Sequence, residues 1–243
     1  MGRSSGTLLA SYLRGQVAAL GAAEAALAAG EPDGVHDARV ATRRLRVALG
    51  EFPRLLPLDD AAVTSARERL RAWGQDLAPA RDLEVQLTAL DAMPDVRDRA
   101  HAVLGPRLDA ARRIAVAQLA KADHLRLRAD LEALAATPPL TAKAGRRWHE
   151  ELPRGLRRAE RRVLRRERAA LTVPPGPSGD EAQHDVRKAA RRARYAAEVV
   201  AQGTGRRARE AAEVGERYRA MQDVLGAAHD EAVLRRTLIE LRG

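Results

Sequence analysis

Apolar residues recur every three or four positions along most of the chain, and short clusters of glycine and proline separate the segments that show this spacing. The segments between these clusters are about 12 to 30 residues long, which is a common length for helices. No run alternates apolar and polar residues in the way that predicts a strand. The pattern therefore predicts an all-α protein of about eight helices. The breaks fall at residues 30–34, 53–60, 78–82, 93–95, 137–141, 173–180 and 202–205.

A charged motif occurs twice in the chain, with the pattern His-Asp-x-Arg-x-x-x-Arg-Arg-x-Arg. The two copies span residues 36–46 and 184–194, an offset of 148 residues. A second pair of similar segments, 77–82 and 225–230, keeps the same offset. Because two matches share one offset, the chain reads as an internal duplication. We expect one domain over 1–243, with helical bundles of about four helices each in 1–138 and 140–243.

On a helical wheel, the basic residues of each motif copy share one face, and small apolar residues fill the opposite face. No acidic residue lies between Ala38 and Gly50, or between Val186 and Ala197. Like charges at such spacing destabilise an isolated helix, so we expect an anion to offset their repulsion. The residues that we expect to contact this anion are His36, Arg39, Arg43, Arg44, Arg46, His184, Arg187, Lys188, Arg191, Arg192 and Arg194.

A third basic stripe follows a spacing of four, three, four and three residues, which keeps its members along one edge of a helix. Two interpretations stay open: an anion-binding edge, or a solvated face partly neutralised by Glu160 and Glu167. We include its first four members among the candidate contacts. The stripe consists of Arg154, Arg158, Arg161, Arg165 and Arg168.

Composition narrows the possible functions. Lysine and arginine number 43 against 33 acidic residues, a net charge of +10, and there is no cysteine. The lack of cysteine excludes disulfides, Cys-ligated metals and a thiol nucleophile. No phosphate-binding glycine loop is present, and the segment 149–153 lacks the second histidine of a zinc protease motif. We therefore expect a protein that is not an enzyme and that uses no cofactor or metal. No apolar run reaches the length of a membrane span, so we expect a soluble, cytoplasmic protein.

The doubled motif resembles the signature of the CHAD family, the conserved histidine α-helical domain. The segment from Gln222 to Gly226 is also similar to that family. The resemblance implies two four-helix bundles related by a pseudo-two-fold axis, which together form a basic surface or channel. It also implies binding of inorganic polyphosphate through the motif residues, and association with polyphosphate granules.

Polyphosphate offers a protein only charge and oxygen acceptors, and arginine binds such groups through paired, charge-assisted hydrogen bonds. If the motif histidines contribute, affinity should rise as the pH falls from about 8 to about 6. Two alternatives stay open, because the same arginines would attract a nucleic acid or an acidic protein partner. The sequence leaves the chain length of the ligand and the oligomeric state open.

Asp82 and Asp230 each precede an apolar helical run. The simplest role for such a residue is a helix N-cap. A salt bridge to a motif arginine of the other half is the alternative.

Overall fold

The computed structural model describes residues 3–174 and 176–242, without the side chains of 227–233, 235, 236 and 242. The described part contains helices and no strand, which confirms the predicted all-α fold. None of its helices is long and apolar enough to cross a membrane. The helices are α1 (Ser5–Ala28), α2 (Gly34–Ala48), α3 (Ala61–Asp76), α4 (Ala78–Asp91), α5 (Pro94–Leu119), α6 (Ala122–Ala136), the short 3₁₀ helix η1 (Ala142–Gly145), α7 (Trp148–Leu171), α8 (Pro177–Val200) and α9 (Arg206–Arg242).

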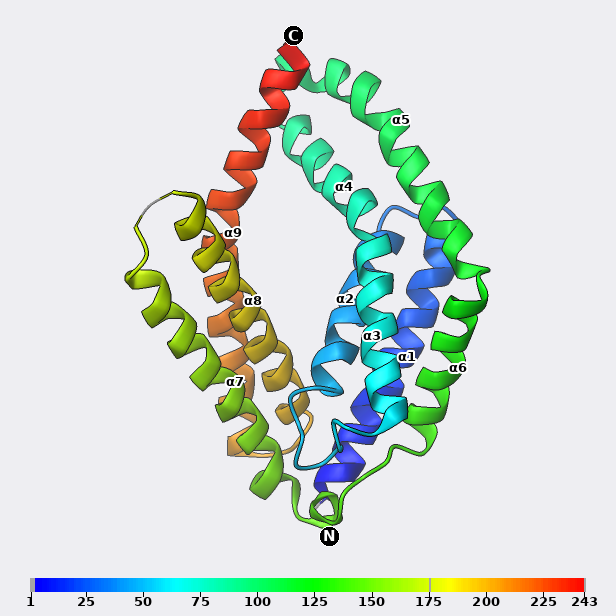
Figure 1. Cartoon of the computed structure of the whole chain (residues 1–243), viewed down its shortest axis with the longest axis vertical. Helices are drawn as coiled ribbons and strands as arrows, with labels where there is room; N and C mark the ends of the chain where they lie inside the picture. The colour runs from blue at the N-terminus through cyan, green and yellow to red at the C-terminus, as the bar shows by residue number, and fades with distance from the viewer. Residues whose placement is uncertain (1–2, 175, 243) are drawn as a thin grey trace.

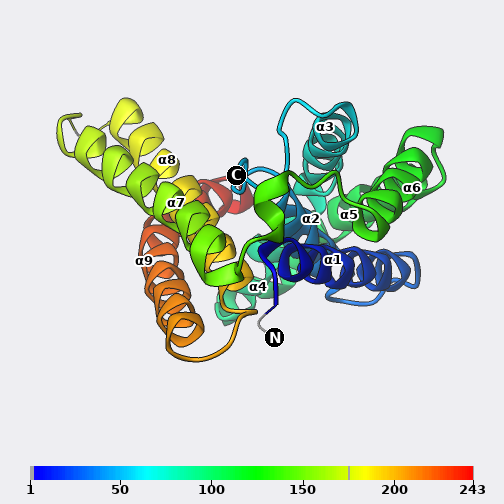
Figure 2. The same ribbon diagram turned by 90° about the horizontal axis from the view of Figure 1, so that it is seen from below.

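The helices form two groups that contact each other at both ends of the molecule. Helices α1 to α6 make one group and α7 to α9 the other (Figures 1 and 2). Near the N-terminus, α7 and α8 pack against α1 and α2; at the far end, α9 packs against α4 and α5. Both motif copies lie at corresponding places, since α2 and α8 are the second helices of the hairpins α1–α2 and α7–α8.

The number of helices per half differs from the expected four. In the described chain, six α-helices lie within 1–138 and three α-helices and η1 within 140–243. The first half is interrupted at Leu77, which ends α3 and precedes α4, whereas α9 runs without a break through the matching stretch. Pro79 lies in the first turn of α4, and proline is tolerated there but not within a helix. Ala227 stands at the matching position of α9, so the helix continues.

The predicted N-cap role of Asp82 is wrong. Because Pro79 lies at the start of α4, that helix begins at Ala78, and Asp82 lies one turn inside it. The backbone of Asp230 lies within α9, and its side chain is outside the described residues. An aspartate does cap α3, where the Asp60 carboxylate accepts hydrogen bonds from the backbone N–H groups of Ala62 and Val63.

The apolar faces of α2 and α8 enter the core, as the wheel predicts. Ala38, Leu45 and Ala48 of α2 are fully buried, and so are Ala193 and Ala197 of α8. Because α2 and α8 also contact each other, their basic faces are held on neighbouring helices. The duplicated motif therefore brings positive charge from both halves to one region.

Candidate anion-binding groove

A cavity of about 660 Å³ lies between α2, α3, α7 and α8. A smaller cavity of about 220 Å³ adjoins it, shares Arg43, Arg46, Arg71 and Arg191 with it, and adds Arg39. We call these two cavities together the central groove. Within the described chain, nine cationic side chains and two carboxylates, those of Glu51 and Glu68, line the larger cavity. The cations are Arg43, Arg46, Arg67, Arg71, Arg158, Arg162, Lys188, Arg191 and Arg192.

Like charges crowd the centre of the groove. Burial, and then the neighbouring charges of Arg43, Arg187 and Arg39, lower the pKa of Arg191 to about 10. Burial, followed by the charge of Arg192, also lowers the pKa of Arg46. A guanidinium group rarely loses its proton in a protein, so a lowered pKa at Arg191 or Arg46 indicates that the cation lies in an unfavourable environment.

Two arginines of α2 have buried donors that the described protein does not satisfy. The Nε atoms of Arg39 and Arg43 are buried and have no hydrogen-bond partner in the described structure. Arg39 makes one long hydrogen bond of 3.4 Å, from Nη1 to the carbonyl oxygen of Gly74. Buried donors are nearly always paired in folded proteins. These donors, in a cavity lined by cations, are suited to an anionic ligand with several oxygen acceptors.

Glu51 partly neutralises one wall of the groove. Its buried carboxylate accepts a hydrogen bond from Arg162, and an oxygen of the same carboxylate lies 3.6 Å from Nη1 of Arg192. A single carboxylate is shared by two guanidinium groups there, so positive charge remains in excess. Glu68, the other carboxylate of the cavity, is exposed.

Arg44 and Arg194, both predicted contacts, lie outside the central groove and share a carboxylate instead. Arg44 donates to Glu198 twice, at 2.7 Å from Nε and 3.2 Å from Nη2, and Nε of Arg194 lies 3.6 Å from Glu198. Both guanidinium groups lie over the ring of Tyr195, at 5.7 and 5.5 Å from its centroid. Burial opposes the charge of Arg44, but the hydrogen bonds that Arg44 donates to Glu198 raise its pKa above the usual value. These two arginines connect α2 to α8.

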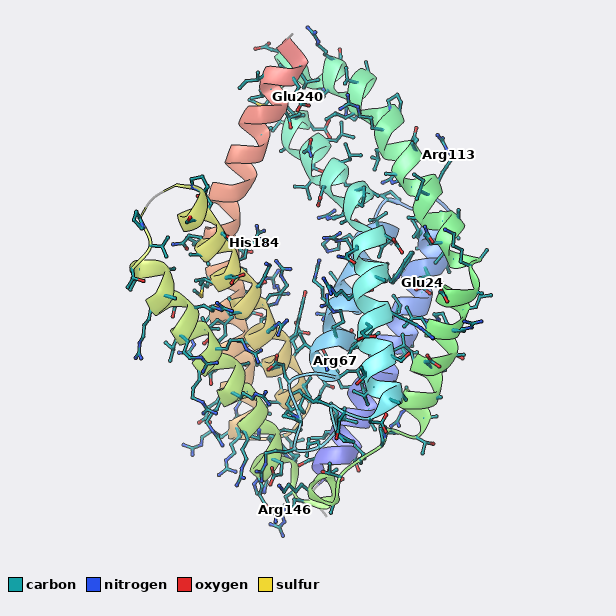
Figure 3. All side chains as sticks on the ribbon, viewed as in Figure 1. Glu24, Arg67, Arg113, Arg146, His184 and Glu240 are labelled. Carbon is teal, nitrogen blue, oxygen red and sulfur yellow. The ribbon has the colours of Figure 1, made fainter. Side chains whose placement is uncertain are left out.

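Three other predicted contacts, His36, Arg187 and His184, do not line the groove, although the first two lie close to its arginines. Burial, and then the charges of Arg81 and Arg43, lower the pKa of His36. Arg187 lies close enough to Arg191 for its charge to contribute to the lowered pKa of Arg191. His184 is exposed on α8 (Figure 3).

The α7 stripe is divided between two cavities. Arg158 lines the central groove, and Arg154, Arg158 and Arg161 line a separate cavity on the other side of Glu51. Arg165 is exposed and lies outside both. The stripe is therefore not one continuous edge of a single site.

Sequence reasoning missed three arginines of the groove, namely Arg67 and Arg71 of α3 and Arg162 of α7. Arg67 and Arg71 have helical spacing, which is a usable signal. Glu68, between them, makes the segment resemble an ordinary surface helix. Their role depends on the packing of α3 beside α2, which places Arg67 at the centre of the molecule (Figure 3).

Comparisons with known proteins agree with this architecture. The family model for the CHAD domain matches residues 11–239. The crystal structure of the CHAD domain from the plant Ricinus communis is similar, with a TM-score of 0.76 and 22% identity over 99% of this chain and 80% of that one. PptA from Streptomyces chartreusis is also similar, with a TM-score of 0.73 and 22% identity over 98% of this chain and 86% of that one. No curated protein matches the sequence. Since the family match includes both motif copies and nearly the whole chain, the protein belongs to the CHAD domain family.

Proposed function

We propose that this protein binds inorganic polyphosphate in the central groove and holds it without hydrolysing it. The observation that carries the proposal is the crowding of Arg39, Arg43 and Arg191, which come from both motif copies and face one another with few carboxylates between them. The resemblance to polyphosphate-binding members of the CHAD family supports the same ligand class.

The chemistry of polyphosphate matches this groove. Each phosphate unit of the chain carries negative charge and oxygen acceptors, and guanidinium groups donate to such oxygens in pairs. A bound anion would satisfy the buried Nε donors of Arg39 and Arg43, and it would offset both the burial and the repulsion that lower the pKa of Arg191. A linear anion fits better than a single phosphate, because the lining cations extend over four helices.

Binding without turnover is part of the proposal. Enzymes that transfer phosphoryl groups normally use carboxylate-bound metal ions to neutralise charge and position the attacking group. The central groove instead presents arginines, and its buried carboxylate, Glu51, is already engaged by Arg162. The lining residues are therefore suited to hold a phosphate chain rather than to cleave it.

A displacement experiment distinguishes polyphosphate from nucleic acid. A fluorescent single-stranded oligonucleotide is bound to the protein and then displaced by unlabelled polyphosphate or by unlabelled oligonucleotide. We expect polyphosphate to displace the probe at a phosphate concentration at least about tenfold lower, because the groove offers guanidinium donors while both tryptophans, Trp73 and Trp148, are buried and cannot stack on bases. More effective displacement by the oligonucleotide would contradict the proposal and favour a nucleic-acid ligand.

A further inference from the structure

A third cavity, of about 370 Å³, lies between α7 and the segment 51–55 that follows α2. We call it the α7 cavity. Its cationic residues on α7 are separated by three, one and three positions, which places them on one face of the helix. Arg54 faces them from the other wall. The α7 residues are Arg154, Arg157, Arg158 and Arg161.

Positive charge is in excess in the α7 cavity. Its two carboxylates are buried and already engaged: Glu151 accepts from Arg54 at 2.7 Å and from Arg146 at 3.2 Å, and Glu51 accepts from Arg162. The hydrogen bond from Arg54 lowers the pKa of Glu151, so this carboxylate remains ionised. Within the described structure, Arg157, Arg158 and Arg161 have no carboxylate at salt-bridge distance. These three arginines are exposed and available to an anion.

The α7 cavity adjoins the central groove, from which it is separated by residues that line both cavities. Arg158 and Glu51 line both cavities. Gly155 lets α7 lie directly against the 51–55 segment, since a Cβ atom there would be 2.5 Å from Cδ1 of Phe52. This contact holds Arg158 between the two cavities. An anionic chain that leaves the central groove past Arg158 therefore meets Arg157 and Arg161 next.

We propose that the α7 cavity is a second anion site, which takes the part of a polyphosphate chain that extends beyond the central groove. This inference rests on the proposed function. A short chain occupies the central groove alone, whereas a long chain reaches both sites. The second contact of a long chain is then intramolecular, and it raises affinity through a high effective concentration. The protein therefore selects for long chains.

The test removes charge from the α7 cavity without touching the central groove. The variant Arg157→Gln/Arg161→Gln changes two exposed residues that line the α7 cavity and not the groove. The matched control is Arg107→Gln/Arg113→Gln, which removes the same charge from two exposed residues of α5 that line neither cavity. Figure 3 shows Arg113 on the outer side of α5. Calorimetry measures the affinity of wild type and both variants for tripolyphosphate and for long-chain polyphosphate, after thermal unfolding shows that all three proteins are folded.

We expect the α7 variant to lose about tenfold in affinity for the long chain, and to keep its tripolyphosphate affinity within about twofold. The control should stay within about twofold of wild type for both ligands. A long-chain affinity equal to that of the control would overturn the inference, as would an equal loss for both chain lengths. Failure of the wild type to bind either chain would instead contradict the proposed function.

Discussion

At the residue scale, the motif arginines have two different roles. Arg43 and Arg191 face the central groove and repel each other, whereas Arg44 and Arg194 are neutralised by Glu198. All four belong to the same repeated pattern, and the sequence predicted one role for all of them. The difference arises because each motif covers a broad helix face, of which one edge meets the groove and the other meets the opposite half.

Arg191 should stabilise the ligand complex at a cost to the free protein. Its environment lowers its pKa to about 10 through burial and the charges of Arg43, Arg187 and Arg39. Arg191→Met removes this buried cation and keeps a side chain of similar length. We expect the free protein to gain on the order of 1 kcal/mol in the free energy of urea unfolding. Its affinity for polyphosphate should fall by about tenfold or more. Lower stability with unchanged affinity would show that Arg191 has a structural role.

His36 should make polyphosphate binding dependent on pH. In the free protein, burial and the charges of Arg81 and Arg43 lower the pKa of His36 below its ordinary value. A bound phosphate chain raises that pKa, so binding takes up a proton and affinity rises as the pH falls. The pKa of His36 in the free protein is below its ordinary value, so the rise in affinity should continue below about pH 6.5. It therefore includes the acidic part of the range from about pH 8 to about pH 6 that the sequence predicts.

The measurement for His36 is polyphosphate affinity between about pH 8 and about pH 5.5, for wild type and His36→Gln. The variant should show a flatter profile, with the largest difference from wild type at the acidic end. Identical profiles would exclude His36 as the titrating group.

At the scale of elements, α2 and α8 are held together by charge pairs that cross between the two halves. Arg44 of α2 binds Glu198 of α8, and Arg192 of α8 lies beside Glu51, which follows α2. The two pairs are reciprocal, because Arg44 and Arg192 occupy the same position of the repeated motif. They fix the spacing of the two basic faces while leaving Arg43 and Arg191 free of such pairing in the described structure.

Glu198→Gln should lower stability more than it changes binding. Glu198 neutralises Arg44 and Arg194, and it also accepts a hydrogen bond from the hydroxyl group of Tyr12. Loss of its charge leaves two partly buried guanidinium groups unpaired, which should cost about 1–3 kcal/mol in urea unfolding. The matched control is Glu210→Gln, which breaks an exposed pair with Arg206 and should change stability by less than about 0.5 kcal/mol.

Measurements of polyphosphate binding distinguish the two possible roles of Arg44 and Arg194, which are to join α2 to α8 or to contact the ligand. Under conditions where Glu198→Gln is folded, its affinity for polyphosphate should remain within about threefold of wild type, because neither arginine lines the groove. If the affinity of Glu198→Gln for polyphosphate rose by more than about tenfold without a loss of stability, Arg44 and Arg194 would be phosphate-binding residues that Glu198 competes for. Glu198 would then not serve mainly to join the two helices.

At the scale of the whole molecule, the two helices that carry the repeated motif, α2 and α8, pack beside each other and share one groove. The sequence was sufficient for the all-α fold and the basic faces, because both depend on local spacing, and the repeated motif was sufficient to suggest the family by its resemblance to the CHAD signature. It was not sufficient for the pairing of Arg44 with Glu198, since the two residues lie 154 positions apart and meet only through the packing of α2 on α8. Arg67 and Arg71 were missed for the same reason, because α3 brings them to the groove.

The central claim is that arginines from both motif copies bind one polyphosphate chain in the central groove. The most direct test is calorimetry with long-chain polyphosphate at two salt concentrations, on the wild type and on Arg39→Ala/Arg43→Ala/Arg187→Ala/Arg191→Ala. We predict that the variant loses about 100-fold or more in affinity and shows a weaker dependence on salt, because fewer cations are neutralised on binding. Equal affinity and equal salt dependence for the two proteins would contradict the account and place the site elsewhere.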